Sequence, residues 1–263
     1  MHEHSAFVTL TYDEENLPKD NSLNPKEFQK WIKRLRKEYS PKKLRYFGVG
    51  EYGDKSDRPH YHAILYGVEP CWKGQSMFDK EGQCCPPCDR ISKTWGKGLV
   101  FIGTVTPDSA GYCCGYVTKK MTSEKTDFQK KYLKGRNPEF ARMSLRPGIG
   151  TEAIHHFVEK SLPYGKDVLK DGKDVLTVIR IAGKKLPIGR YLRGKIREKI
   201  GETKEVSPEA MAEYAKTLQE VFREAYVRPE YKNKTLAMIH ADLIAGKVAS
   251  IEKKYSMNKE RKL

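Results

Sequence analysis

The chain has 263 residues, of which 38% are hydrophobic, so it can bury a core as one large domain or two small ones. Its net charge of +16, from 50 Lys and Arg against 34 Asp and Glu, favours a polyanionic partner, nucleic acid before an acidic membrane surface. No run of about 18 apolar residues occurs and the first residues do not resemble a signal peptide, so we expect no membrane span, no membrane partner and no secretion.

Strands and helices alternate through the first half of the chain. The segment 5–12 is rich in β-branched and aromatic residues and predicts a strand, and Asn24 and Pro25 predict the start of a helix that runs to about residue 39. Strands are expected at 44–51 and 60–66, joined as a hairpin, and at 99–106, with helices at 89–95 and 109–121. This order predicts an α+β, ferredoxin-like fold, with a central antiparallel sheet and flanking helices.

The composition changes after residue 124. A basic connecting region is expected over 125–165, and a basic, mainly helical region for DNA or partner binding over 166–263, with a strand at 175–182 and helices at 190–201 and 209–226. The basic stretches 119–146 and 180–204 suit contacts with a phosphate backbone. The alternative is a charged surface that is merely solvated.

Two histidines are spaced for a shared metal ion. His60 and His62 lie two apart in a predicted strand, so both side chains leave the same face, about 7 Å apart. Glu51, on the partner strand of the hairpin, can add a carboxylate oxygen. Imidazole and carboxylate ligands with open positions suit catalytic Mg²⁺ or Mn²⁺. The alternative is a pair of strand histidines without a ligand.

The predicted helix 109–121 carries two tyrosines on one face. Tyr112, Tyr116 and Lys119 are spaced i, i+4 and i+7, so they share that face. The opposite side can pack on the sheet, through Ala110, Cys113, Cys114, Val117 and Met121. A phenol beside a bound cation can attack a phosphodiester and store the broken linkage as phosphotyrosine. The alternative places the tyrosines on the buried side of the helix.

Four cysteines fall in the loop between the hairpin and the next helix. Cys71, Cys84, Cys85 and Cys88 could hold a structural Zn²⁺, since the last pair has the spacing of a zinc-binding pair. The alternatives are free thiols or a redox pair. The clustered cysteines favour a reducing compartment over a disulfide framework.

These motifs together resemble the HUH endonuclease superfamily of rolling-circle replication initiators, and most closely the replication initiation proteins of gokushovirus-like microviruses. The resemblance covers most of residues 5–200, and is carried by segments 9–12, 48–53, 58–67 and 183–192 together with the tyrosine motif. It implies that residues 1–124 form the nicking domain, in which His60 and His62, with Glu51 as third ligand, bind Mg²⁺ or Mn²⁺. Tyr112 and Tyr116 would be the nucleophiles, with Lys119 beside them.

The resemblance also implies the substrate and the partners. Such proteins cut one strand of single-stranded or supercoiled origin DNA, keep the 5′ phosphate on tyrosine, leave a 3′-OH primer and later rejoin the displaced strand. Further DNA contacts are expected from Arg58, Lys120, Arg190 and Arg193. No Gly-x4-Gly-Lys-Ser/Thr phosphate loop occurs, so a host helicase, DNA polymerase and single-strand binding protein would be required, in the cytoplasm of the host bacterium.

Two other functions are compatible with the sequence. A relaxase or single-strand transposase would use the same tyrosine chemistry on a mobile-element substrate. A non-catalytic nucleic-acid-binding protein would bind DNA through the same basic surface, and it would cleave no strand with any divalent ion.

Overall fold

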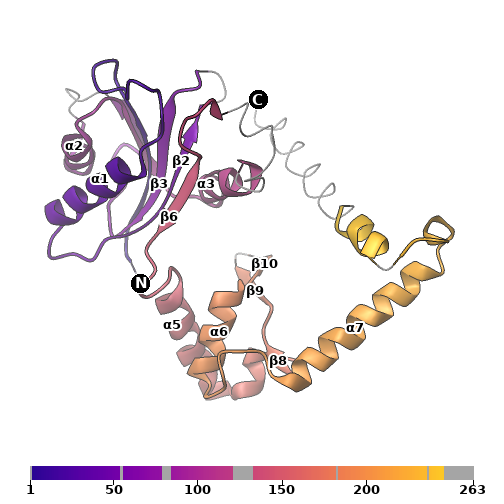
Figure 1. Cartoon of the computed structure of the whole chain (residues 1–263). Coiled ribbons are helices and arrows are strands. Elements are labelled where there is room, and N and C mark those ends of the chain that lie inside the picture. The colour runs from indigo at the N-terminus through magenta and orange to yellow at the C-terminus, as the bar shows by residue number, and fades with distance from the viewer. Residues whose placement is uncertain are drawn as a thin grey trace. The chain divides into compact units, whose positions relative to one another are not determined.

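The computed structural model describes residues 2–53, 56–78, 84–120, 133–181, 183–235 and 237–245. The chain divides into two compact units, residues 1–149 and 150–263. Figure 1 shows the sheet and its helices in the first unit and mainly helices in the second. None of the described helices is both long and apolar enough to cross a membrane. The functional domains predicted at 1–124, 125–165 and 166–263 stay predictions.

A six-stranded antiparallel sheet forms the centre of the first unit, in the order β4-β5-β1-β3-β2-β6. Its strands are β1 (Ser5–Thr11), β2 (Arg45–Tyr52), β3 (Pro59–Tyr66), β4 (Gln75–Phe78), β5 (Val100–Thr104) and β6 (Phe140–Met143). The predicted α+β fold with a central antiparallel sheet is therefore confirmed. The edge strands β4 and β6 were not predicted, because four residues show too little alternation to mark a strand.

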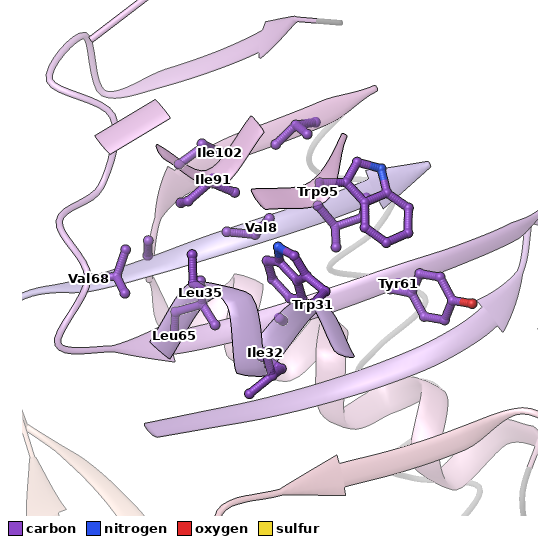
Figure 2. Close-up of a cluster of buried hydrophobic side chains, with 14 of the residues drawn as sticks. Val8, Trp31, Ile32, Leu35, Tyr61, Leu65, Val68, Ile91, Trp95 and Ile102 are labelled. Carbon is purple, nitrogen blue, oxygen red and sulfur yellow. The ribbon is translucent and has the colours of Figure 1, made fainter. Parts of the chain in front are cut away.

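Helices α1 (Pro25–Glu38) and α2 (Pro86–Trp95) cover one face of the sheet. The Asn24 side chain accepts hydrogen bonds from the backbone N–H groups of Lys26 and Glu27, and so caps α1 at its predicted start. The apolar stripe of α1 is buried against alternate residues of the strands. Figure 2 shows this core, with Trp31 and Trp95 over the sheet near Tyr61.

Helix α3 (Pro107–Lys120) packs on the other face of the sheet. Cys113 is fully buried there against Phe7 and Ile64, and Ala110 is partly buried beside them, as predicted. The prediction for Cys114 was wrong, because this residue is exposed. One residue turns a helix by about 100°, which carries Cys114 away from the sheet. Val117 and Met121 lie outside the side chains that the structure describes.

The second unit has its own small core. Its elements are α5 (Thr151–Ser161), η1 (Leu162–Tyr164), η2 (Lys166–Leu169), β7 (Lys170–Asp171), β8 (Asp174–Val175), β9 (Val178–Ile181), β10 (Lys184–Pro187), α6 (Arg190–Lys199), α7 (Pro208–Tyr226) and η3 (Pro229–Tyr231). Helices α6 and α7 begin within a residue of the predicted positions. The single strand predicted at 175–182 is instead divided between β8 and β9, and α5 was not predicted.

A buried ion pair joins β8 to α6 in this unit. Arg197 donates to both carboxylate oxygens of Asp174, each at 2.7 Å, and both residues are only 3% exposed. Tyr214 of α7 and the backbone N–H of Val175 also donate to this carboxylate. Burial alone would raise the pKa of Asp174, but these donors outweigh it and lower the pKa well below its usual value.

Candidate active site

The central strand β3 places the two histidines on the face that α3 covers. His62 lies opposite Thr9 of β1, and His60 lies opposite both Thr11 of β1 and Glu51 of β2. Residues directly opposite in an antiparallel sheet point to the same side, and so do residues two apart in one strand. All five side chains therefore share one face, as the His-x-His spacing predicts.

Glu51 and His62 form a buried pair at the centre of this face. The ring N–H of His62 at Nε2 donates to Glu51 Oε1 at 2.6 Å, and Thr9 Oγ1 lies 2.8 Å from Nδ1 on the other side of the ring. Glu51 is 3% and His62 5% exposed. Glu51 Oε2 is buried and has no hydrogen-bond partner among the described residues.

This unpartnered oxygen fits a cation ligand. A buried carboxylate oxygen without a donor is costly, and a bound cation would remove that cost. Ligand atoms at adjacent positions around Mg²⁺ lie about 3 Å apart, close to the observed separation of Nε2 and Oε1. The donor set of one carboxylate and one imidazole suits Mg²⁺ or Mn²⁺. Glu51 and His62 therefore meet the requirements of the predicted metal site.

His60 is held apart from this pair. Its Nδ1 lies 3.0 Å from Thr11 Oγ1, and its Nε2 faces the backbone at Gly53, where a Cβ would lie only 2.7 Å away. Two ligands of one Mg²⁺ lie at most about 4.2 Å apart. Among the described residues, three or more potential ligand atoms come within 4.8 Å of one another only in the cysteine cluster. His60 must therefore turn its side chain to share an ion with Glu51 and His62.

The environment of His60 keeps its ring neutral. Burial lowers the pKa of His60 to about 4, with further contributions from His62 and Arg58. A neutral imidazole has a lone pair for a metal ion, whereas a protonated one has none. His60 thus has the charge state of a ligand, although its ring position here is not that of one.

Tyr112 of α3 lies directly over His62. The two rings meet edge to face, with centroids 5.2 Å apart and an interplanar angle of 89°. Phe7 stacks on the His62 ring and meets Tyr112 edge to face. Tyr112 stays 46% exposed. The structure thus brings the first predicted nucleophile beside the second predicted histidine.

These residues line one pocket of about 360 Å³. It lies between the sheet and the first turns of α3, and its walls are Phe7, Thr9, His62, Phe101, Asp108, Ser109 and Tyr112. The pocket has an open mouth, an imidazole at its base and a phenol at its side. It can admit an extended chain end or a backbone phosphate to both groups at once.

The other predicted site residues vary in what the structure shows. The backbone of Tyr116, Lys119 and Lys120 continues α3, which keeps Tyr116 one turn beyond Tyr112, but their side chains lie outside those described. Arg58 contacts Glu14 and donates to the backbone oxygen of Tyr12.

The two arginines of the second unit also differ. Arg190 is exposed. Arg193 pairs with the buried Asp174 and donates to Tyr214, so its charge is matched inside the unit. The DNA contacts predicted for Arg58, Lys120, Arg190 and Arg193 stay predictions.

Sequence reasoning missed the residues that hold the histidines. Thr9 and Thr11 had been singled out only as part of a motif, and Phe7 had no role. The available signal was the alternation of β1, where Phe7, Thr9 and Thr11 are two apart and must share a face. What the sequence lacked was the register, which sets Thr9 and Thr11 opposite the two histidines.

The four cysteines of the predicted zinc site also come together. Their sulfur atoms all lie within 4.8 Å of one another, so this cluster could hold a metal ion. It belongs to the core on the opposite face of the sheet from Tyr112, through Cys71, Cys85 and Cys88. It is therefore separate from the pocket at His62.

Comparison with known proteins points to phage replication. Residues 5–121 match the family of the replication-associated protein ORF2. The chain is 31% identical over 179 residues to replication-associated protein VP4 of Bdellovibrio phage phiMH2K, covering 65% of this chain and 55% of that protein. It is 34% identical over 164 residues to replication-associated protein ORF2 of Spiroplasma virus 4, covering 59% and 48%.

A third relative is replication-associated protein ORF4 of Chlamydia phage 1, which is 26% identical over 219 residues, covering 79% of this chain and 50% of that protein. The chain thus spans about half the length of the curated relatives it matches. No solved structure matches it. The resemblance to phage replication proteins that the motifs predicted is confirmed.

Proposed function

We propose that this chain, a relative of the phage replication-associated proteins, initiates rolling-circle replication by nicking one DNA strand at the phage origin. The observation that carries the proposal is the contact of Tyr112 with His62, whose ring is held between Thr9 and Glu51 in a single pocket. A nucleophile, a charge-stabilising site and room for a phosphate are what phosphoryl transfer to tyrosine needs.

The proposed reaction exchanges one phosphate ester for another. The phenol oxygen of Tyr112 attacks the phosphorus, the bond from phosphorus to the 3′ oxygen breaks, and the phenol proton is lost as the 3′ oxygen gains one. The products are a 5′-phosphotyrosine and a 3′-OH that can prime synthesis. Tyr116, one helical turn further along α3, would attack a second phosphate to release and rejoin the displaced strand.

Glu51 and His62 would hold the cation, and His60 would join them after turning its ring. A bound Mg²⁺ or Mn²⁺ would supply positive charge at the phosphate oxygens, which a phenol with an ordinary pKa of about 10 requires for attack at neutral pH. Thr9 fixes the orientation of His62 by its contact with Nδ1. A threonine hydroxyl can donate or accept, so it supports either tautomer of the ring.

The charge of the chain supports a DNA substrate. A net charge of +16 gives a strong, salt-dependent attraction to a phosphate backbone. The relatives' names place them in replication, which favours an initiator over a relaxase or a transposase. Host helicase, polymerase and single-strand binding protein would complete the replication machinery in the bacterial cytoplasm.

The decisive experiment detects the covalent intermediate. The protein is incubated with circular single-stranded phage DNA and Mn²⁺ or Mg²⁺, and we expect an SDS-resistant protein–DNA adduct whose site maps by mass spectrometry to Tyr112 or Tyr116. Tyr164→Phe is the matched control, because Tyr164 lies in the second unit and is 80% exposed. This control should form the adduct at the wild-type level.

Two results would overturn the proposal. An adduct that persists in the Tyr112→Phe, Tyr116→Phe double variant would show that the nucleophiles are wrongly assigned. Wild-type protein that binds DNA yet cleaves none with any divalent ion would favour the non-catalytic binding protein.

A further inference from the structure

The cysteine cluster joins three separate parts of the fold. Cys71 follows β3 and precedes the edge strand β4, Cys84 and Cys85 lie directly before α2, and Cys88 lies in the first turn of that helix. Cys71 Sγ and Cys84 Sγ are 3.8 Å apart, and all four sulfurs lie within 4.8 Å of one another. None of the four is in a disulfide.

We propose that Cys71, Cys84, Cys85 and Cys88 bind one structural Zn²⁺ as four thiolates. Sulfurs at the corners of a tetrahedron with Zn–S bonds of about 2.3 Å are about 3.8 Å apart, which is the distance between Cys71 and Cys84. A disulfide would need about 2.05 Å. The sulfurs already stand at the spacing that one tetrahedral ion requires.

The surroundings suit a negatively charged thiolate site. Cys71, Cys85 and Cys88 are buried. Ser76 Oγ donates to Cys71 Sγ at 3.3 Å and lies 3.4 Å from Cys88 Sγ. Cys85 is the N-cap residue of α2, where the unpaired N–H groups of the first turn favour negative charge. These donors are the second layer of contacts that metal thiolates commonly have.

The expected role is structural rather than catalytic. Four protein ligands leave a zinc ion no open position for a substrate. The edge strand β4 has only four residues, paired to β5, so backbone pairing alone holds it weakly. A zinc ion would tie the chain before β4 to the start of α2. This inference does not rest on the proposed nicking activity.

Metal content and cobalt substitution test the site. Untagged protein purified under reducing conditions is expected to carry one zinc per chain by elemental analysis, retained after washing with excess Mg²⁺. Co²⁺ replacing it should give the intense thiolate-to-cobalt charge-transfer absorption, which a site made of Glu51 and His62 cannot give. The Cys71→Ser, Cys88→Ser double variant should lose zinc and this absorption, and the Cys114→Ser control should keep both.

Alkylation of the wild-type protein keeps the test valid if the double variant does not fold. The four clustered thiols should resist iodoacetamide until a strong chelator is added, whereas the exposed Cys114 should react before and after chelation. The proposal is overturned if zinc-reconstituted protein holds no zinc, if its clustered thiols react as fast as Cys114, or if the folded double variant keeps its zinc. Adduct formation on DNA is scored separately, so failure of one proposal does not imply failure of the other.

Discussion

Replacing Thr9 by Val tests whether the buried pair of His62 and Glu51 is the metal site. Val keeps the shape of the side chain but removes the hydroxyl that lies 2.8 Å from His62 Nδ1. Loss of such a supporting contact commonly weakens metal binding by about 10- to 100-fold, or roughly 1.4 to 2.8 kcal/mol at 1.4 kcal/mol for each tenfold step. The fold should lose only about 1 kcal/mol, the usual contribution of one neutral hydrogen bond.

The assay is cleavage of single-stranded origin DNA as a function of Mn²⁺ concentration. For Thr9→Val we expect the half-saturating Mn²⁺ concentration to rise by about 10- to 100-fold, while the rate at saturating metal stays near that of the wild type. Chemical denaturation checks that the variant is folded. Thr104→Val is the matched control, because Thr104 lies at the exposed end of β5 and bonds only weakly to a backbone oxygen.

Thr11→Val makes the same change beside His60. If His60 turns to bind the ion, its release from Thr11 changes the metal dependence too; if His60 never binds it, only Thr9→Val has an effect. An unchanged Mn²⁺ dependence in Thr9→Val, with cleavage intact, would refute the assignment of His62 as a ligand held by Thr9.

Three further predictions concern the fold and the position of His60. Asp174→Asn should destabilise the second unit by about 3–5 kcal/mol, since it leaves Arg197 buried without its partner. Because the pKa of Asp174 is lowered on folding, its contribution is complete above the unfolded value of about 4 and is lost as the pH falls below it, which denaturation of the wild type and the variant across pH 2–7 will show. Gly53→Ala should displace His60, because the added Cβ would lie 2.7 Å from Nε2, and a shifted His60 ring resonance by NMR checks this. Trp31→Ala, at a site with no exposed surface, should cost about 3–5 kcal/mol in denaturant unfolding; a loss below 1 kcal/mol in either Asp174→Asn or Trp31→Ala would contradict the packing described.

Local sequence patterns were sufficient for much of the first unit. The stripe of Phe28, Trp31, Ile32 and Leu35 identified α1 and its buried side, since helical periodicity is a property of neighbouring residues. The same holds for the hairpin of β2 and β3, where the two-residue spacing of His60 and His62 fixed their common face.

Local patterns failed where a segment depends on a distant partner. Strand β6 lies in a basic stretch without clear alternation, and it forms because β2 offers a free edge about 90 residues earlier in the chain. The four cysteines have irregular spacing, and only the folding of the loop beside α2 brings their sulfurs together.

The sequence by itself determined which chemical groups the site contains: two imidazoles on one strand face, a carboxylate on the next strand, and a tyrosine pair on a helix. Only the tertiary structure decided which of them meet. The register of β1 against β3 gives each histidine a threonine, the packing of α3 sets Tyr112 over His62, and the side-chain rotamer leaves His60 facing Gly53. Register, helix docking and rotamers depend on contacts between residues far apart in the chain, and no local pattern encodes them.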